Sequence, residues 1–159
     1  MPRDGLDMTL TAPVILPDLL QLTKAALGPV ETIFDIAREK LRATVTENDR
    51  ISGKLIEENQ TASHGLAWLA TYVESLRQMQ GWAERQQAEG GFNELEQLLL
   101  QITFGEYLCQ ISGGIPMNQG EILRLQDIGV GQDDMRAMMD ASVKTLTQGG
   151  NIQAARTRL

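Results

Sequence analysis

Hydrophobic residues recur at intervals of three and four along most of the chain, which is the spacing that gathers them on one face of an α-helix. The longest such stretch spans residues 50–88 and predicts a helix about 55 to 60 Å long. Shorter stretches predict helices at residues 17–27, 29–45, 93–112, 119–126, 132–147 and 152–159. The stripe of the longest helix consists of Ile51, Leu55, Ala62, Leu66, Leu69, Val73, Leu76 and Ala83.

Glycine and proline divide these stretches. Gly28-Pro29 predicts a break between the first two helices, because the proline ring restricts both its own backbone and that of the residue before it. Asn48 or Asp49 is the expected N-cap of the longest helix, and Gly65 marks a position for a kink within it. Short connections between long amphipathic helices indicate an all-α fold, namely an up-down helical bundle with one very long helix and no sheet.

The same pattern divides the chain into three parts. Residues 1–16 form an irregular lead, residues 17–150 form one helical bundle domain, and residues 151–159 begin a further helix or linker. Within the domain, the predicted helix at residues 93–112 is apolar around most of its circumference, so we expect it to be buried on more than one side. Its apolar residues are Leu95, Leu98, Leu99, Leu100, Ile102, Phe104, Leu108 and Ile111.

Composition sets limits on the class of protein. The 159 residues are 42% hydrophobic and 22% charged, which is typical of one globular domain. The formal net charge of −7 argues against a nucleic-acid partner, because that partner is itself a polyanion. The sequence contains no apolar run near the ~20 residues that span a bilayer and no signal-peptide pattern. We therefore expect a cytoplasmic protein with neither a membrane nor a nucleic acid as partner.

Catalytic and metal-binding chemistry has little support. The single cysteine, Cys109, excludes an internal disulfide, and the single histidine, His64, excludes every site that needs two imidazoles. His64 lies seven residues after Glu57, on the same predicted helix face, but one imidazole and one carboxylate are an incomplete set of metal ligands. Cys109 lies in an apolar helix, where a small buried cysteine is common. No catalytic, cofactor-binding or metal-binding residue is assigned.

Three further patterns resemble active-site motifs, but each has a simpler structural explanation. Glu94, Glu96 and Glu106 lack a nucleophile or a second base, so ordinary solvated carboxylates are expected. Gly129-Val130-Gly131 lacks the third glycine and the preceding strand of a dinucleotide-binding loop. Gly113-Gly114 is expected to end a helix rather than to bind a phosphate.

Aromatic and methionine side chains are the candidates for an interface. Tryptophan and tyrosine are enriched at interface centres, and methionine makes adaptable binding surfaces. The same residues also suit the packing of a helical bundle, so both interpretations stay open. The candidates are Trp68, Tyr72, Trp82, Met135, Met138 and Met139.

Three segments of the chain carry a family resemblance. They are GLAWLATYVESLRQM at 65–79, FNELEQLLLQI at 92–102 and FGEYLCQISGGIPM at 104–117. Together they resemble the N-terminal helical extension of the methylsuccinyl-CoA dehydrogenases, flavin enzymes of the acyl-CoA dehydrogenase family, over roughly residues 45–130. The remainder matches only in being helical.

The resemblance implies a parent enzyme that oxidises an acyl-CoA thioester at its α and β carbons. Such an enzyme uses FAD and a glutamate base, and it passes electrons to an electron-transfer flavoprotein within ethylmalonyl-CoA carbon assimilation. The flavin-binding region and the catalytic glutamate of that family have no counterpart in these 159 residues. The resemblance therefore implies no FAD bound by this chain, but FAD in the parent enzyme.

Three hypotheses follow, in order of preference. The first is a non-catalytic helical domain that packs on or assembles the catalytic part of an acyl-CoA dehydrogenase, in the same chain or a separate one. The second is a free-standing helical protein-interaction module, and the third is a helical metalloenzyme centred on His64. A homo-oligomer is also expected, because one small bundle cannot cover a helix of about 55 Å along its whole length.

Overall fold

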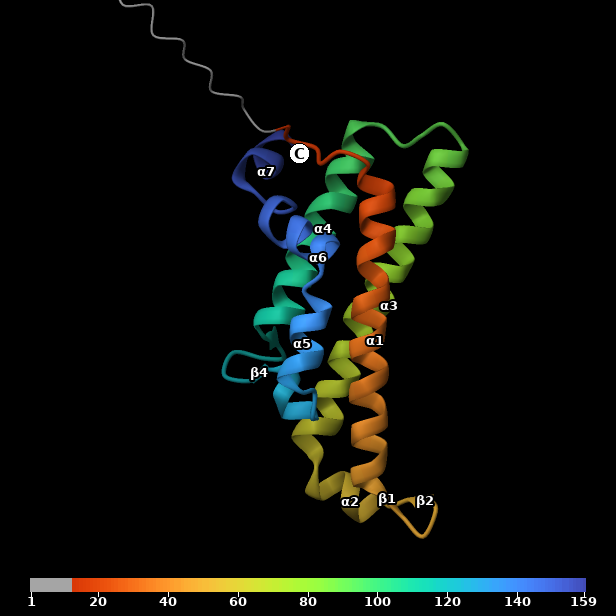
Figure 1. Cartoon of the computed structure of the whole chain (residues 1–159), viewed down its shortest axis with the longest axis vertical. Helices are drawn as coiled ribbons and strands as arrows, with labels where there is room; N and C mark the ends of the chain where they lie inside the picture. The colour runs from red at the N-terminus through yellow and green to blue at the C-terminus, as the bar shows by residue number, and fades with distance from the viewer. Residues whose placement is uncertain (1–12) are drawn as a thin grey trace, which may run out of the picture.

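Four helical columns run alternately up and down in a computed structural model that describes residues 13–159 (Figure 1). The first three columns are α1 (Leu19–Val45), α3 (Gln60–Ala88) and α4 (Glu94–Gly113). The fourth is divided between α5 (Gln132–Met138) and α6 (Ala141–Gly149). Helix α1 packs on α3, α3 packs on α4, and α4 packs on α6. The predicted all-α, up-down bundle is confirmed.

One contiguous core joins the four columns. Its largest fully buried side chain is Phe104 of α4, which lies among leucine and isoleucine side chains from every column. Burial of each such side chain contributes about 1.5–3 kcal/mol to the free energy of unfolding. The residues with at most 1% exposure in this core are Ala26, Val30, Ile33, Ala37, Leu69, Val73, Leu76, Ala83, Leu100, Phe104, Leu108, Ile111, Ile115, Val143 and Leu146.

The break predicted at Gly28-Pro29 is wrong, because α1 continues through Pro29 as one helix of 27 residues. A proline inside a helix costs about 3 kcal/mol, through a lost hydrogen bond and a clash with the preceding turn. Ala26, Val30 and Ile33 are 0–1% exposed on the two sides of the proline. Their burial in the core outweighs the local cost, so packing keeps the helix continuous.

The helix predicted over residues 50–88 begins later than expected. The strands β1 (Thr46–Glu47) and β2 (Arg50–Ile51) form an antiparallel hairpin, the short helix α2 (Gly53–Glu58) follows, and α3 contributes 29 residues of the predicted helix. Asn48 and Asp49 have φ of 51° and 58°, so they form the hairpin turn instead of an N-cap. Ser52 is the N-cap, since its hydroxyl accepts a hydrogen bond from the backbone N–H of Leu55.

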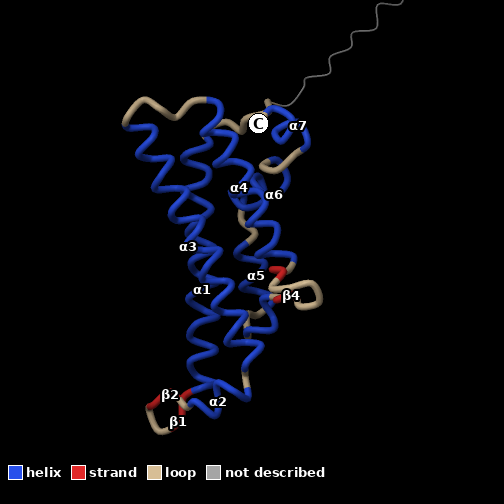
Figure 2. Tube along the Cα trace, turned by 180° about the vertical axis from the view of Figure 1, so that it is seen from behind, coloured by secondary structure: helices blue, strands red, loops and turns tan. Residues whose placement is uncertain are grey.

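A second hairpin replaces the helix predicted at residues 119–126. Strands β3 (Ile115–Pro116) and β4 (Ile122–Leu123) pair antiparallel, and the 3₁₀ helix η1 (Leu125–Ile128) follows. The Asn118 side chain accepts hydrogen bonds from the backbone N–H groups of Gly120 and Glu121, which stabilises the turn. The expected absence of any sheet is therefore corrected: the described residues contain two short hairpins (Figure 2).

Gly65 contacts the second hairpin rather than marking a kink. Leu123 of β4 is buried directly against the Gly65 backbone, and a Cβ atom at position 65 would collide with the leucine side chain. The glycine therefore allows β4 to approach α3 closely.

The helix predicted at residues 132–147 is interrupted at Asp140, the N-cap of α6. Its carboxylate accepts hydrogen bonds from the backbone N–H of Val143 at 2.9 Å and from the Ser142 hydroxyl at 2.6 Å. Partial burial alone would raise the pKa of Asp140, but these hydrogen bonds outweigh it and hold the pKa below its ordinary value.

Replacement of this N-cap gives a pH-dependent loss of stability. We expect Asp140→Ala to lower the free energy of unfolding by about 1 kcal/mol at neutral pH. A lowered pKa in the folded state means that the ionised carboxylate stabilises the protein above its unfolded pKa of about 3.9 and loses that effect as the pH falls through the folded-state value. Urea unfolding of both proteins between neutral and acidic pH measures this difference. Asp140→Asn, which keeps the cap without the charge, is the matched control.

The end of the chain packs on the bundle. Helix α7 (Gln153–Arg158) contacts α4, Ala155 is fully buried, and Arg158 forms an ion pair with Glu94 at the start of α4. At the other end, residues 13–16 lack regular structure, and the rest of the predicted lead lies outside the described residues. The boundary predicted at residue 150 stays a prediction.

Candidate interaction surface

Trp68 and Tyr72 lie on α3, where both are engaged by neighbouring side chains. The Tyr72 ring stacks on Tyr107 of α4 with centroids 4.6 Å apart, and its hydroxyl donates a hydrogen bond to the Gln110 side chain. Burial, then the nearby Tyr107 and Glu106, raises the pKa of Tyr72. This pair therefore joins α3 to α4, and only the remaining exposed part of Tyr72 is available to a partner.

His64 is hydrogen-bonded to Trp68 rather than placed as a metal ligand. The indole Nε1 of Trp68 donates to His64 Nε2 at 3.0 Å. Glu57 lies on α2, beyond the break between α2 and α3, so the expected continuous helix face shared with His64 does not form. Residues 13–159 contain no group of three or more histidine, cysteine, aspartate or glutamate side chains arranged to hold a metal ion.

Trp82 lies further along α3, and the three methionines lie at α5 and directly after it. Trp82, Met135 and Met139 are half-buried and pack against the core, and Met138 is only 3% exposed. Met138 is thus a core residue of the isolated chain. An interface role for the exposed parts of the other five candidates stays a prediction.

The carboxylates singled out in the sequence have local structural partners. Glu96 closes a capping box by accepting a hydrogen bond from the Asn93 backbone N–H at 3.0 Å. Glu94 pairs with Arg158, which lowers the pKa of the glutamate. Glu106 accepts a hydrogen bond from Gln110 at 3.2 Å. These contacts stabilise helix ends and turns, as expected for ordinary solvated carboxylates.

Cys109 is exposed, which corrects the expectation of a buried cysteine. Its thiol donates to the Thr147 carbonyl oxygen at 3.4 Å. Partial burial of the sulfur, and then the Glu106 carboxylate, raises the pKa of the Cys109 thiol. A raised pKa disfavours the thiolate, so the environment is opposite to that of a catalytic cysteine.

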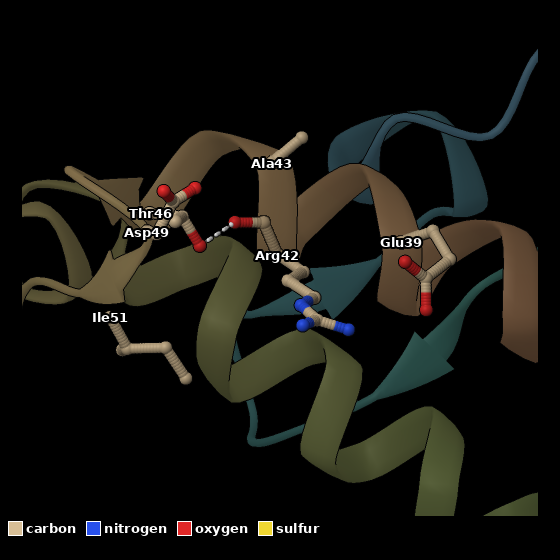
Figure 3. A pocket seen from close by; sticks show the side chains of 6 residues that line it. All are labelled: Glu39, Arg42, Ala43, Thr46, Asp49 and Ile51. Atoms are coloured by element: carbon tan, nitrogen blue, oxygen red, sulfur yellow. Dashed lines mark hydrogen bonds between the residues drawn. The ribbon is translucent and has the colours of Figure 1, made fainter.

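A hollow of about 640 Å³ lies between the end of α1 and the first hairpin (Figure 3). Its walls are Glu39, Arg42, Ala43, Thr46, Asp49 and Ile51, all exposed except the half-buried Thr46. The Thr46 hydroxyl donates to the Arg42 carbonyl at 2.7 Å, the bond drawn in Figure 3.

This hollow does not fit a flavin. Cofactor sites bury most of the ligand between mainly apolar walls, whereas this hollow is open and four of its six wall residues are polar or charged. A pyrophosphate is bound by backbone N–H groups at a helix N-terminus, but this hollow lies at the C-terminal end of α1. Glu39 and Asp49 outnumber the one cation of the walls, Arg42, so the net charge of the hollow is negative and repels a phosphate. No step of flavin chemistry is therefore assigned to it.

Two leucines on α4 are more exposed than the sequence predicts. Leu95 and Leu99 are 53% and 37% exposed, although the helix was predicted to be buried on more than one side. The apolar pattern does identify this second face, but within the described residues no other element covers it. This face is therefore the most informative candidate for contact with another chain or domain.

The geometry thus defines a helical domain with a packed core and an uncovered apolar face. None of the helices in residues 13–159 is long and apolar enough to cross a membrane. No protein-family model matches the chain. The chain is 51% identical over 150 residues to (2S)-methylsuccinyl-CoA dehydrogenase from Cereibacter sphaeroides. The match covers 94% of this chain and 27% of that enzyme, so the chain spans about a quarter of the length of its relative.

This similarity confirms the resemblance found in the sequence and extends it well beyond residues 45–130. It establishes homology to part of an acyl-CoA dehydrogenase.

Proposed function

We propose that the chain is a non-catalytic helical domain of an FAD-dependent acyl-CoA dehydrogenase that acts on methylsuccinyl-CoA. In this proposal the domain is the N-terminal extension and packs on or assembles the catalytic part of a cytoplasmic, homo-oligomeric enzyme. The observation that carries the proposal is the 51% identity over nearly the whole chain to only 27% of the dehydrogenase.

The local chemistry of the chain supports a non-catalytic role. Glu94 and Glu96 take part in contacts that stabilise α4, and the environment of Cys109 disfavours its thiolate. The large hollow beside α1 lacks the walls that a flavin needs. FAD and the glutamate base are accordingly assigned to the catalytic part of the parent enzyme, together with the passage of electrons to an electron-transfer flavoprotein.

Two measurements on the purified 159-residue chain test the non-catalytic role. We expect no visible flavin absorbance after incubation with excess FAD and desalting. We also expect no methylsuccinyl-CoA-dependent reduction of an artificial electron acceptor, while the Cereibacter sphaeroides enzyme serves as the positive control for both. Stoichiometric bound FAD or turnover would overturn the non-catalytic role.

The link to a dehydrogenase is tested in the source cells. We expect the affinity-purified gene product to contain acyl-CoA dehydrogenase peptides, either in the same polypeptide or in a stable partner. Recovery of other proteins without any dehydrogenase would refute the link and favour a free-standing helical interaction module.

A further inference from the structure

The uncovered face of α4 is a continuous apolar stripe. We define the α4 outer stripe as Leu95, Leu99 and Ile102. The two leucines are exposed, and Ile102 is half-buried but does not belong to the set of hydrophobic residues that pack against the core. By contrast, Leu100 and Phe104 of the same helix are fully buried. Helix α4 therefore has one apolar side for the core and a second apolar side facing outward.

The spacing of the three residues in the stripe indicates that the element covering it is a helix. Leu95, Leu99 and Ile102 are separated by four and then three residues, which is the alternation that gives a helix a straight seam. Such a seam packs against the side chains of another helix running alongside. A single strand or a small ligand would not match the two helical turns that the stripe occupies.

The charges around the stripe indicate what the covering helix carries. Helix α4 contains Glu94, Glu96 and Glu106 and no lysine or arginine. Within residues 13–159, only Glu94 of these three carboxylates has an ion-pair partner, Arg158 of α7. A second copy of the chain, packed stripe to stripe, would bring two acidic helices together, and like charges across a helix pair are destabilising. A helix with an apolar seam and basic residues at its margins complements the stripe better than a second copy does.

We propose that the α4 outer stripe is the docking surface for a helix of the catalytic part of the dehydrogenase. This inference rests on the proposed function. The similarity to a chain of which about three quarters lies outside the match supplies a large partner of the required kind. Ile51 and Ile122 are also strongly exposed. Each stands alone on one of the two hairpins, so neither belongs to a comparable seam. Isolated exposed hydrophobic residues are normal on protein surfaces.

A photo-crosslinking experiment tests the surface directly. A photoreactive amino acid replaces Ile102 in the gene product expressed from its own locus in the source cells, and the cross-linked peptides are identified by mass spectrometry. We expect cross-links to one helix of an acyl-CoA dehydrogenase catalytic region, in the same polypeptide or in a partner. The same photoreactive amino acid at Ile122, which is 50% exposed on β4, is expected to give no cross-link to that helix.

A pair of matched variants tests whether the leucines hold the partner. Leu95→Gln with Leu99→Gln removes apolar surface from exposed positions, and we expect it to lower the cross-link yield from position 102 at least about tenfold. Ile51→Gln with Ile122→Gln makes the same chemical change on the hairpins and is expected to leave the yield unchanged. Circular dichroism and thermal unfolding of the isolated variant chains verify that both keep the fold.

The outcomes separate this inference from the proposed function. Cross-links from position 102 to a second copy of the chain would overturn the docking surface, and so would an undiminished yield in the leucine variant. Cross-links to the dehydrogenase from position 122 alone would overturn the docking surface while keeping the proposed function. A gene product associated with no dehydrogenase from either position would overturn both.

Discussion

Gln101→Leu is expected to lower the free energy of unfolding by about 4 kcal/mol. Gln101 is completely buried in α4 and makes three hydrogen bonds to the backbone of two other segments. Its Oε1 accepts from the Leu16 N–H at 2.7 Å, and its Nε2 donates to the carbonyls of Val14 at 2.9 Å and Gly150 at 3.2 Å. Leucine has a similar volume but leaves all three backbone groups without this partner.

Urea unfolding followed by far-ultraviolet circular dichroism measures this loss. Gln97→Leu, one turn earlier on α4, is the matched control, because Gln97 is half-buried and makes one hydrogen bond, to the Phe92 carbonyl. We expect the control to lose no more than about 1 kcal/mol. Hydrogen exchange adds a local test: the Leu16 amide is expected to lose protection in Gln101→Leu. Equal losses in the two variants would show that Gln101 has no special role in fixing residues 14–16.

The long helices could be predicted from the sequence because local pattern and tertiary packing favour the same structure there. Leu69, Val73 and Leu76 recur at helical spacing, and all three are fully buried in α3. The predictions of helix boundaries were wrong where the local pattern and the tertiary packing favour different structures. At Pro29 the local preference is for a break, but buried residues on both sides keep α1 continuous.

The hairpins were missed for a different reason. Both contain two-residue strands, which are too short to show an alternating pattern. The first depends on positive φ at Asn48 and Asp49, and these residue types also suit an N-cap. Sequence alone therefore identified the right residues for a local boundary but assigned them the wrong conformation.

The candidate surface shows the same limit. Periodicity identified α4 as apolar on more than one side, but it could not show which side the chain itself covers. The folded structure separates Leu100 and Phe104, which face the core, from Leu95 and Leu99, which do not. Aromatic content pointed instead to Trp68 and Tyr72, whose rings already pack within the bundle. The exposure of each side chain identifies the candidate surface, and that exposure is determined by the fold.

Gly105→Ala is expected to lower the free energy of unfolding by about 3 kcal/mol, because α4 and the end of α6 are in backbone contact at this glycine. A Cβ atom at position 105 would lie 2.6 Å from the Asn151 nitrogen and 2.8 Å from the Gly150 carbonyl carbon. Both are backbone atoms, so relief requires the two segments to move apart rather than one side chain to rotate. Thermal and urea unfolding measure the change.

Gly113→Ala is the matched control, since Gly113 is the last residue of the same helix and has no atom within 4 Å of an added Cβ. We expect its free energy of unfolding to stay within about 0.5 kcal/mol of that of the parent chain.

Gln101 donates to the same Gly150 carbonyl group that an added Cβ at position 105 would displace. The two predicted losses therefore share one contact between α4 and Gly150. A double variant of Gln101→Leu and Gly105→Ala should accordingly lose less than the sum of the single losses, whereas strict additivity would show that the two residues act on independent parts of the bundle.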